Sequence, residues 1–106
     1  MNVSRSDFHR EEIPDDNHDA SYLEQDGWED RLAEYRRGDF GFIGIRAVVD
    51  LYIPTNRGGY IMQRIESPGL WSIESDSDES YLQEVYAEEC AQLAEMLVTL
   101  GVTVED

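Results

Sequence analysis

Carboxylates are the chemically active side chains that this sequence supplies in quantity, and many of them lie in its C-terminal part. From Glu66 to the last residue the chain carries eleven acidic residues and no Lys or Arg. Four of these acids fall within six positions. Three more recur at spacings of four and seven, which places them within about 40° on one side of a helix. Carboxylates grouped in this way can hold a cation, transfer a proton or face a positively charged partner. The two groups are Glu74, Asp76, Asp78 and Glu79, and Glu84, Glu88 and Glu95.

A calcium site is one alternative, because Asp76 and Asp78 have the spacing of the first two ligands in an EF-hand loop. That loop also needs Gly at its sixth position and Glu at its twelfth. The sequence has Tyr81 and Ala87 there, so the segment is interpreted as a helix start, where Asp and Ser accept hydrogen bonds from free N–H groups. The polar cluster at 15–19 is interpreted as solvated chain rather than a metal site. We expect no metal and no cofactor.

Enzymatic chemistry lacks its usual partners in this chain. His9 and His18 both fall in a polar N-terminal stretch. Cys90 is the single cysteine, and it has no ordered His nearby in the predicted elements to activate its thiol. No glycine loop leads into a helix as phosphate binding requires. The sequence therefore predicts a non-enzymatic protein without catalytic residues.

The charge of the chain excludes some partners and favours others. The 24 acidic residues are opposed by eight Arg and no Lys, which gives a net charge of −16. A surface of this sign repels nucleic acid and anionic membranes and attracts basic proteins. No apolar run approaches the ~18 residues of a membrane span, and no signal region is recognisable. A cytoplasmic protein is therefore expected.

Domain organisation follows from length and periodicity. A chain of 106 residues indicates one domain. Residues 1–20 are polar, lack a period and contain Pro14, so a flexible acidic arm is predicted there. Residues 21–106 are predicted to form a single α+β domain. Its first element is a short helix over 28–37, because Trp28, Leu32 and Tyr35 form a narrow apolar stripe. Asp26 is the expected cap of this helix and Gly38 its end.

Three strands are predicted after this helix, at 40–53, 60–66 and 70–74. The first has the strongest pattern, because its apolar residues alternate over its whole length. The turns at Thr55–Gly59 and Ser67–Gly69 would reverse the chain twice and produce an antiparallel meander. The residues expected on one face of the first strand are Ile43, Ile45, Ala47, Val49, Leu51 and Ile53.

A long C-terminal helix is predicted over 78–100, and it should pack across one face of the sheet. Its apolar residues recur at 3.6 spacing, and Gly101 should terminate it. Glu89 falls near the apolar arc, where a bare carboxylate would be costly. We expect it at the boundary of the helix, or paired with Arg46 or Arg64 of the sheet.

The segment 70–101 resembles the sequences of small acidic proteins encoded by phages and other mobile elements. The residues that carry the resemblance are WSIESDSDESYL, VYAEEC and LAEMLVTLG. Some proteins of this kind act as anti-CRISPR or anti-restriction factors, in some cases by mimicking DNA. The resemblance thus implies an inhibitor of host defence, and it assigns no functional residue.

Two hypotheses of function follow from these patterns. The first is an acidic inhibitor that binds the nucleic-acid-binding surface of a basic protein, such as a CRISPR effector or a restriction enzyme, without binding nucleic acid or membrane itself. The alternative is a small homodimeric or adaptor protein that uses an apolar sheet face, with its acidity serving solubility. The residues expected to contact the partner in the first case are Trp71 and Tyr81 as aromatic anchors, with Glu74, Asp76, Asp78, Glu79, Glu84, Glu88 and Glu95.

Overall fold

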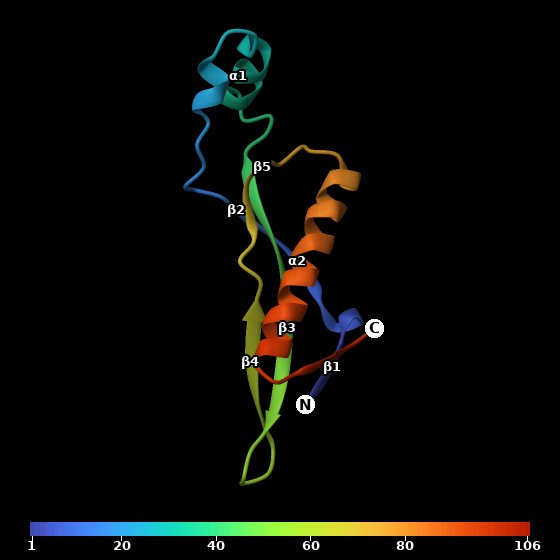
Figure 1. Cartoon of the computed structure of the whole chain (residues 1–106). Helices are drawn as coiled ribbons and strands as arrows, with labels where there is room; N and C mark the ends of the chain where they lie inside the picture. The colour runs from blue at the N-terminus through green and yellow to red at the C-terminus, as the bar shows by residue number, and fades with distance from the viewer.

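The computed structural model describes all of residues 1–106 and has the shape of a rod, with extents of 61 × 25 × 19 Å (Figure 1). It is an α+β fold in which two α-helices accompany a sheet that is mostly antiparallel. No helix has the length and apolar character needed to cross a membrane. The elements are β1 Asn2–Ser4, η1 Arg5–Asp7, β2 His9–Pro14, η2 Ser21–Glu24, α1 Glu29–Arg36, β3 Phe42–Pro54, β4 Tyr60–Glu66, β5 Leu70–Glu74, α2 Glu79–Thr99 and β6 Thr103–Glu105.

Strand β3 is the backbone of the rod, because every other strand of the main sheet pairs with it. β2 lies along one edge, from His9 opposite Val48 to Pro14 opposite Ile43. β4 and β5 follow one another along the other edge, β4 opposite residues 48–54 and β5 opposite residues 42–45. The predicted meander is wrong in this detail, since β5 pairs with β3 and not with β4. The Ser67–Gly69 segment interrupts the strand without reversing it.

Helix α2 packs along one face of β3, as the two patterns of periodicity predicted. Leu93 and Leu97 of the helix are fully buried against Ala47, Val49 and Leu51 of the strand. Nearer the start of α2, Leu82 and Val85 cover Ile45 and Ile73. The apolar residues that recur every second position in the strand and every 3.6 positions in the helix therefore pack into one continuous apolar layer.

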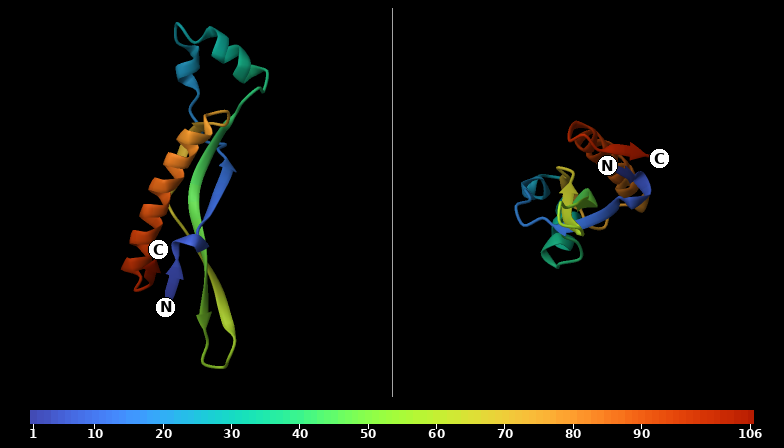
Figure 2. Two further views of the ribbon diagram at one scale, coloured as in Figure 1. Left: turned by 90° about the vertical axis from the view of Figure 1, so that its right-hand side faces the viewer. Right: turned by 90° about the horizontal axis from the view of Figure 1, so that it is seen from below.

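The first fourteen residues are ordered, which differs from the flexible arm predicted for residues 1–20. β1 pairs in parallel with β6, so both ends of the chain lie together beside α2 (Figures 1 and 2). Phe8 is buried in the same core as Leu97. Strand β2 cannot be recognised from alternating hydropathy, because its Glu11 is held by an ion pair with Arg46 of the neighbouring strand and not by apolar packing.

Residues 15–41 leave the sheet between β2 and β3 and form a separate lobe at one end of the rod, which we call the α1 lobe (Figure 1). Its small core consists of Leu23 and Phe40, together with Phe42 at the start of β3. The predicted helix is present over Glu29–Arg36, but the expected cap at Asp26 is not. Trp28 occupies the N-cap position, and no side-chain hydrogen bond closes the helix there.

The opposite end of the rod is a two-stranded ribbon that extends beyond α2 (Figure 2). We call residues 52–62 the hairpin tip. Gly58 and Gly59 at its turn have φ values of 82° and 80°, which L-residues with a Cβ rarely adopt. The hairpin predicted from the paired glycines is therefore present, with Pro54 opposite Tyr60 as the last strand pair.

Candidate partner-binding surface

The acids predicted to contact a partner separate into two groups in the structure. Glu74, Asp76 and Glu79 form ion pairs with arginines of distant segments. The remaining four are exposed and have no arginine partner: Asp78, Glu84, Glu88 and Glu95. The first group is therefore bound within the fold, and only the second group is free to contact a partner.

Arg31 of α1 gathers the first group. Its guanidinium donates to Glu74 at 2.5 Å and to Asp76 at 2.5 and 2.8 Å, and it lies 3.6 Å above the ring of Phe40. Tyr22 of the lobe also donates its hydroxyl to Glu74. Hydrogen bonds from Arg31 hold the pKa of Asp76 below its ordinary value of 3.8. These acids connect the α1 lobe to the sheet and are already occupied.

Glu79 is occupied in a similar way, at the start of α2. Arg10 of β2 donates to Glu79 at 2.5 and 3.1 Å and also to Glu12. These bonds lower the pKa of Glu79 from its ordinary value of 4.5. A carboxylate that shares an arginine is a weaker site for a basic partner than a free one.

The free acids of α2 are sparse. Glu84, Glu88 and Glu95 share one side of the helix and span eleven residues, or about 16 Å at 1.5 Å per residue. Three charges over this distance are far fewer than the one charge per ~1.7 Å that duplex DNA carries. The α2 stripe alone therefore does not reproduce the charge density of a phosphate backbone.

A denser set of free acids lies on the α1 lobe. Of the 24 acidic residues, ten form ion pairs with arginine and two are buried, which leaves twelve exposed acids without an arginine partner. Half of these twelve lie in the lobe itself, in the fifteen-residue stretch 16–30, and we call them the lobe acids. They are Asp16, Asp19, Glu24, Asp26, Glu29 and Asp30.

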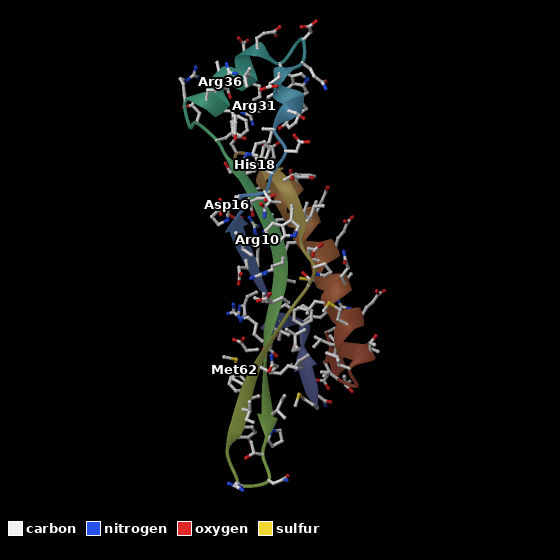
Figure 3. The ribbon with its side chains drawn as sticks, turned by 90° about the vertical axis from the view of Figure 1, so that its left-hand side faces the viewer. Arg10, Asp16, His18, Arg31, Arg36 and Met62 are labelled. Carbon is white, nitrogen blue, oxygen red and sulfur yellow. The ribbon has the colours of Figure 1, made fainter.

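None of the lobe acids was among the predicted contact residues. A signal for them exists in the sequence, because no arginine lies between Arg10 and Arg31. The segment was interpreted as part of a flexible arm and a short helix, so its charges were not expected to be held in a fixed arrangement. Five of them lie on η2, α1 and the adjoining turns, which fold over one aromatic cluster, while Asp16 lies closer to the sheet (Figure 3).

The segment that carries Asp16 and His18 is fixed by contacts to the start of β3 and to α1 (Figure 3). His18 stacks on Phe42 at a centroid distance of 4.4 Å, and its Nε2 lies 2.7 Å from the hydroxyl of Tyr35. Asp15 was expected to be solvated, but it is buried and accepts the N–H of Ser72 at 2.8 Å. Ser72 has a positive φ of 61°, so this bond helps to hold a strained residue.

The two predicted aromatic anchors are both at the surface. Trp71 lies against Gly44, where an added Cβ would come within 2.2 Å of the indole ring, and its Nε1 donates to the carbonyl of Pro68 at 3.1 Å. Tyr81 is exposed in the first turn of α2. Trp71 is therefore held by Gly44 of the neighbouring strand β3 and by the Pro68 carbonyl just before β5.

Glu89 has a structural partner other than the arginines predicted for it. Its carboxylate is buried and accepts hydrogen bonds from the Ser67 hydroxyl at 2.8 Å and the Gly69 N–H at 2.6 Å. Arg46 and Arg64 cannot reach it, because even-numbered residues at this part of the sheet point away from α2. Glu89 thus secures the junction between β4 and β5 instead of serving a partner.

Comparisons of the chain with models of protein families, with curated proteins and with solved structures find no match. The resemblance of residues 70–101 to small acidic phage proteins therefore stays a prediction. The function has to be inferred from the surfaces of the chain itself.

Proposed function

We propose that this protein is a non-enzymatic acidic inhibitor that binds the positively charged, nucleic-acid-binding surface of a protein partner. A CRISPR effector or a restriction enzyme has a surface of this kind. The observation that carries the proposal is the set of twelve exposed acids without an arginine partner, six of which gather on the α1 lobe.

The size of the charge supports a role beyond solubility. A net charge of about 2–8 is sufficient to keep a small domain soluble, whereas this chain carries −16. Charge of one sign also destabilises the folded state through self-repulsion. Binding to a basic partner would offset this self-repulsion when the complex forms.

The paired and the free acids support different parts of the mechanism. Glu74 and Asp76 hold the lobe against the sheet through Arg31, whereas Glu79 joins α2 to β2 through Arg10. The lobe acids would then face the partner's Lys and Arg side chains, with Glu84, Glu88 and Glu95 as a second, sparser contact. Binding would exclude nucleic acid by occupying its site.

The experiment is a pull-down from the lysate of the native host at ~0.1 M and ~0.5 M salt, read by mass spectrometry. Interactions between exposed charges are largely screened at the higher concentration. We expect a nucleic-acid-binding protein to be recovered at low salt and lost at high salt. A partner that is retained equally at both would contradict the electrostatic mechanism.

Charge-neutralising variants locate the surface. We expect Glu24→Gln, Asp26→Asn, Glu29→Gln and Asp30→Asn together to abolish the recovery, since they remove four of the six lobe acids while keeping their shapes. The control is the triple variant Glu84→Gln, Glu88→Gln and Glu95→Gln, which should reduce recovery less. The reverse order would place the main contact on α2.

A second candidate function is favoured by one separate observation. The hairpin tip exposes large apolar side chains at the end of the rod opposite the α1 lobe, among them Tyr52 and Tyr60. This is compatible with the alternative of a homodimeric or adaptor protein. The acidic lobe and the apolar tip are distinct surfaces, so both functions can reside in one chain.

A further inference from the structure

The hairpin tip carries the main group of exposed apolar side chains in this chain. Tyr60 is 71% exposed and Ile61 58% exposed. Their neighbours Tyr52, Ile53 and Met62 are exposed as well. Because successive residues of a strand point to opposite faces, these side chains cover both faces of the ribbon. A patch of this kind is typical of an interaction site.

The backbone of the same segment also lacks partners. β4 pairs with β3 on one edge only, so its outer edge is open from Tyr60 to Glu66. The pairing of β2 with β3 stops at Val48, which leaves the hairpin tip as a ribbon of two strands. A two-stranded ribbon is marginally stable in water on its own. An open edge with apolar side chains is a site for pairing with another strand.

The distribution of charge indicates which strand could pair with the open edge of β4. No acidic residue lies between Asp50 and Glu66, although the whole chain carries −16. Arg57 at the turn forms no ion pair. Two copies of so acidic a chain repel each other at most surfaces. They can approach at the hairpin tip, which is also the part of the rod farthest from the lobe acids (Figures 1 and 3).

We propose that the open edge of β4 pairs antiparallel with the same edge of a second copy, so that the two sheets become continuous across a two-fold axis. A register centred on Gln63 sets Ile61 of each copy opposite Ile65 of the other, on the α2 side of the sheet. Apolar cross-strand pairs of this kind stabilise a sheet. Arg64 would lie opposite Met62, so no like charges meet directly.

The dimer keeps the two acidic ends apart. Each rod is 61 Å long, and an overlap of the two hairpins of about 30 Å gives an assembly of roughly 90 Å. The two α1 lobes would then stand at its opposite ends. This inference deepens the second candidate function and does not depend on the acidic inhibitor, because it uses neither the lobe acids nor the stripe of α2.

The first test is the molar mass of the full chain by light scattering after gel filtration, at ~0.1 M and ~0.5 M salt. Salt screens the repulsion between the copies, so we expect the dimer to be favoured at high salt. This is opposite to the effect expected for a basic partner, so the two proposals can fail separately. A folded chain that stays at its monomer mass of 12.2 kDa at both salts overturns self-pairing and leaves the edge to a strand of another protein.

Two matched variants locate the interface. Ile61→Lys places a charge on the open edge and should shift the chain to the monomer, with an unchanged circular dichroism spectrum. Val98→Lys is the control, because Val98 on α2 is 62% exposed and lies outside the proposed interface. A dimer that survives Ile61→Lys and is lost in Val98→Lys would assign the interface to α2.

A disulfide tests the register directly. Residues opposite each other in an antiparallel pair have Cα atoms about 4.5–5.5 Å apart, which is within reach of a disulfide. Gln63→Cys in a Cys90→Ser background should therefore form a covalent dimer under mild oxidation, whereas Val98→Cys in the same background should not. Equal cross-linking of the two variants would overturn the proposed pairing.

Discussion

The α1 lobe and the hairpin tip stand at opposite ends of β3, and they differ in both charge and cover. The lobe encloses Leu23 and Phe40 in its own small core and carries six free acids outside. The tip has no acid and no core, and its large apolar side chains face water. At one end of β3 the chain therefore forms a packed lobe with a charged surface, and at the other end it forms a ribbon with exposed apolar side chains. In the two proposals above, the lobe faces a basic partner and the ribbon pairs with another strand.

Because one end has a packed core and the other does not, substitutions should affect the two ends differently. The lobe depends on contacts between segments far apart in the sequence, such as Arg31 with Asp76. The tip depends on local pairing across one turn. Changes at the lobe should therefore open it without disturbing the tip.

The largest effect is expected for Phe42→Ala. Phe42 is buried at the start of β3, where His18 stacks on it and Tyr35 and Phe40 contact its edge. Removing a buried Phe side chain costs about 3–5 kcal/mol. Native-state hydrogen exchange should show lost protection in residues 15–41 and little change in β4. Equal loss of protection at both ends would contradict the independence of the two regions.

A smaller effect is expected for Arg31→Ala. This change removes the hydrogen bonds to Glu34, Glu74 and Asp76 and leaves three neighbouring carboxylates without a counterion, which we expect to cost about 1–2 kcal/mol in a partly exposed site. Urea unfolding followed by circular dichroism measures it.

Arg36→Ala is the matched control, since Arg36 lies on the same helix, is exposed and forms no ion pair. Its free energy of unfolding should stay within about 0.5 kcal/mol of the wild type. If both substitutions cost the same, the ion pairs of Arg31 do not hold the lobe.

The smallest effect is expected on acidification. The folded-state pKa values of Asp76 and Glu79 lie below their ordinary values of 3.8 and 4.5, chiefly because of hydrogen bonds from Arg31 and Arg10. Their contribution is therefore complete above these ordinary values and is lost as the pH falls through the folded-state pKa values. Exchange of amides in the lobe for Asp76, and in the first turn of α2 for Glu79, should report this loss when followed by NMR between pH 6 and pH 3 and corrected for the intrinsic rate.

The amides of β4 at the hairpin provide the comparison in the same spectra. No carboxylate lies within residues 51–65, so the opening free energy of this segment should change less with pH than that of the lobe. A parallel change at both ends would indicate that acid acts on the whole fold and not on these two arginine contacts.

Local patterns predicted most of the elements, because they depend on neighbouring residues. Strand periodicity located β4 and β5 at their observed bounds, and the apolar face of α2 met the predicted face of β3. Ser67–Pro68–Gly69 was interpreted as a chain reversal, since Pro and Gly are typical of turns. It continues along β3 instead, because Ser67 bonds to Ala47, and Glu89, which is 22 residues from Ser67 and 20 from Gly69, binds both of them.

The candidate surface was predicted only in part, for a similar reason. The sequence shows how many acids there are, but an acid is free only if no arginine reaches it. Arg10 pairs with Glu79 over 69 positions and Arg31 with Asp76 over 45, and no spacing rule predicts such contacts. The stripe of Glu84, Glu88 and Glu95 was predictable, because it requires only the period of one helix.

By itself, the sequence determined the α+β class, the long amphipathic helix, the hairpin and the net charge, since these follow from local periodicity, turn residues and composition. Only the tertiary structure decided which acids are free, that residues 2–14 join the fold, and that one end of the rod is acidic and the other apolar. The physical reason is that ion pairs, burial and open strand edges are relations between distant segments, and these come into existence only when the chain is folded.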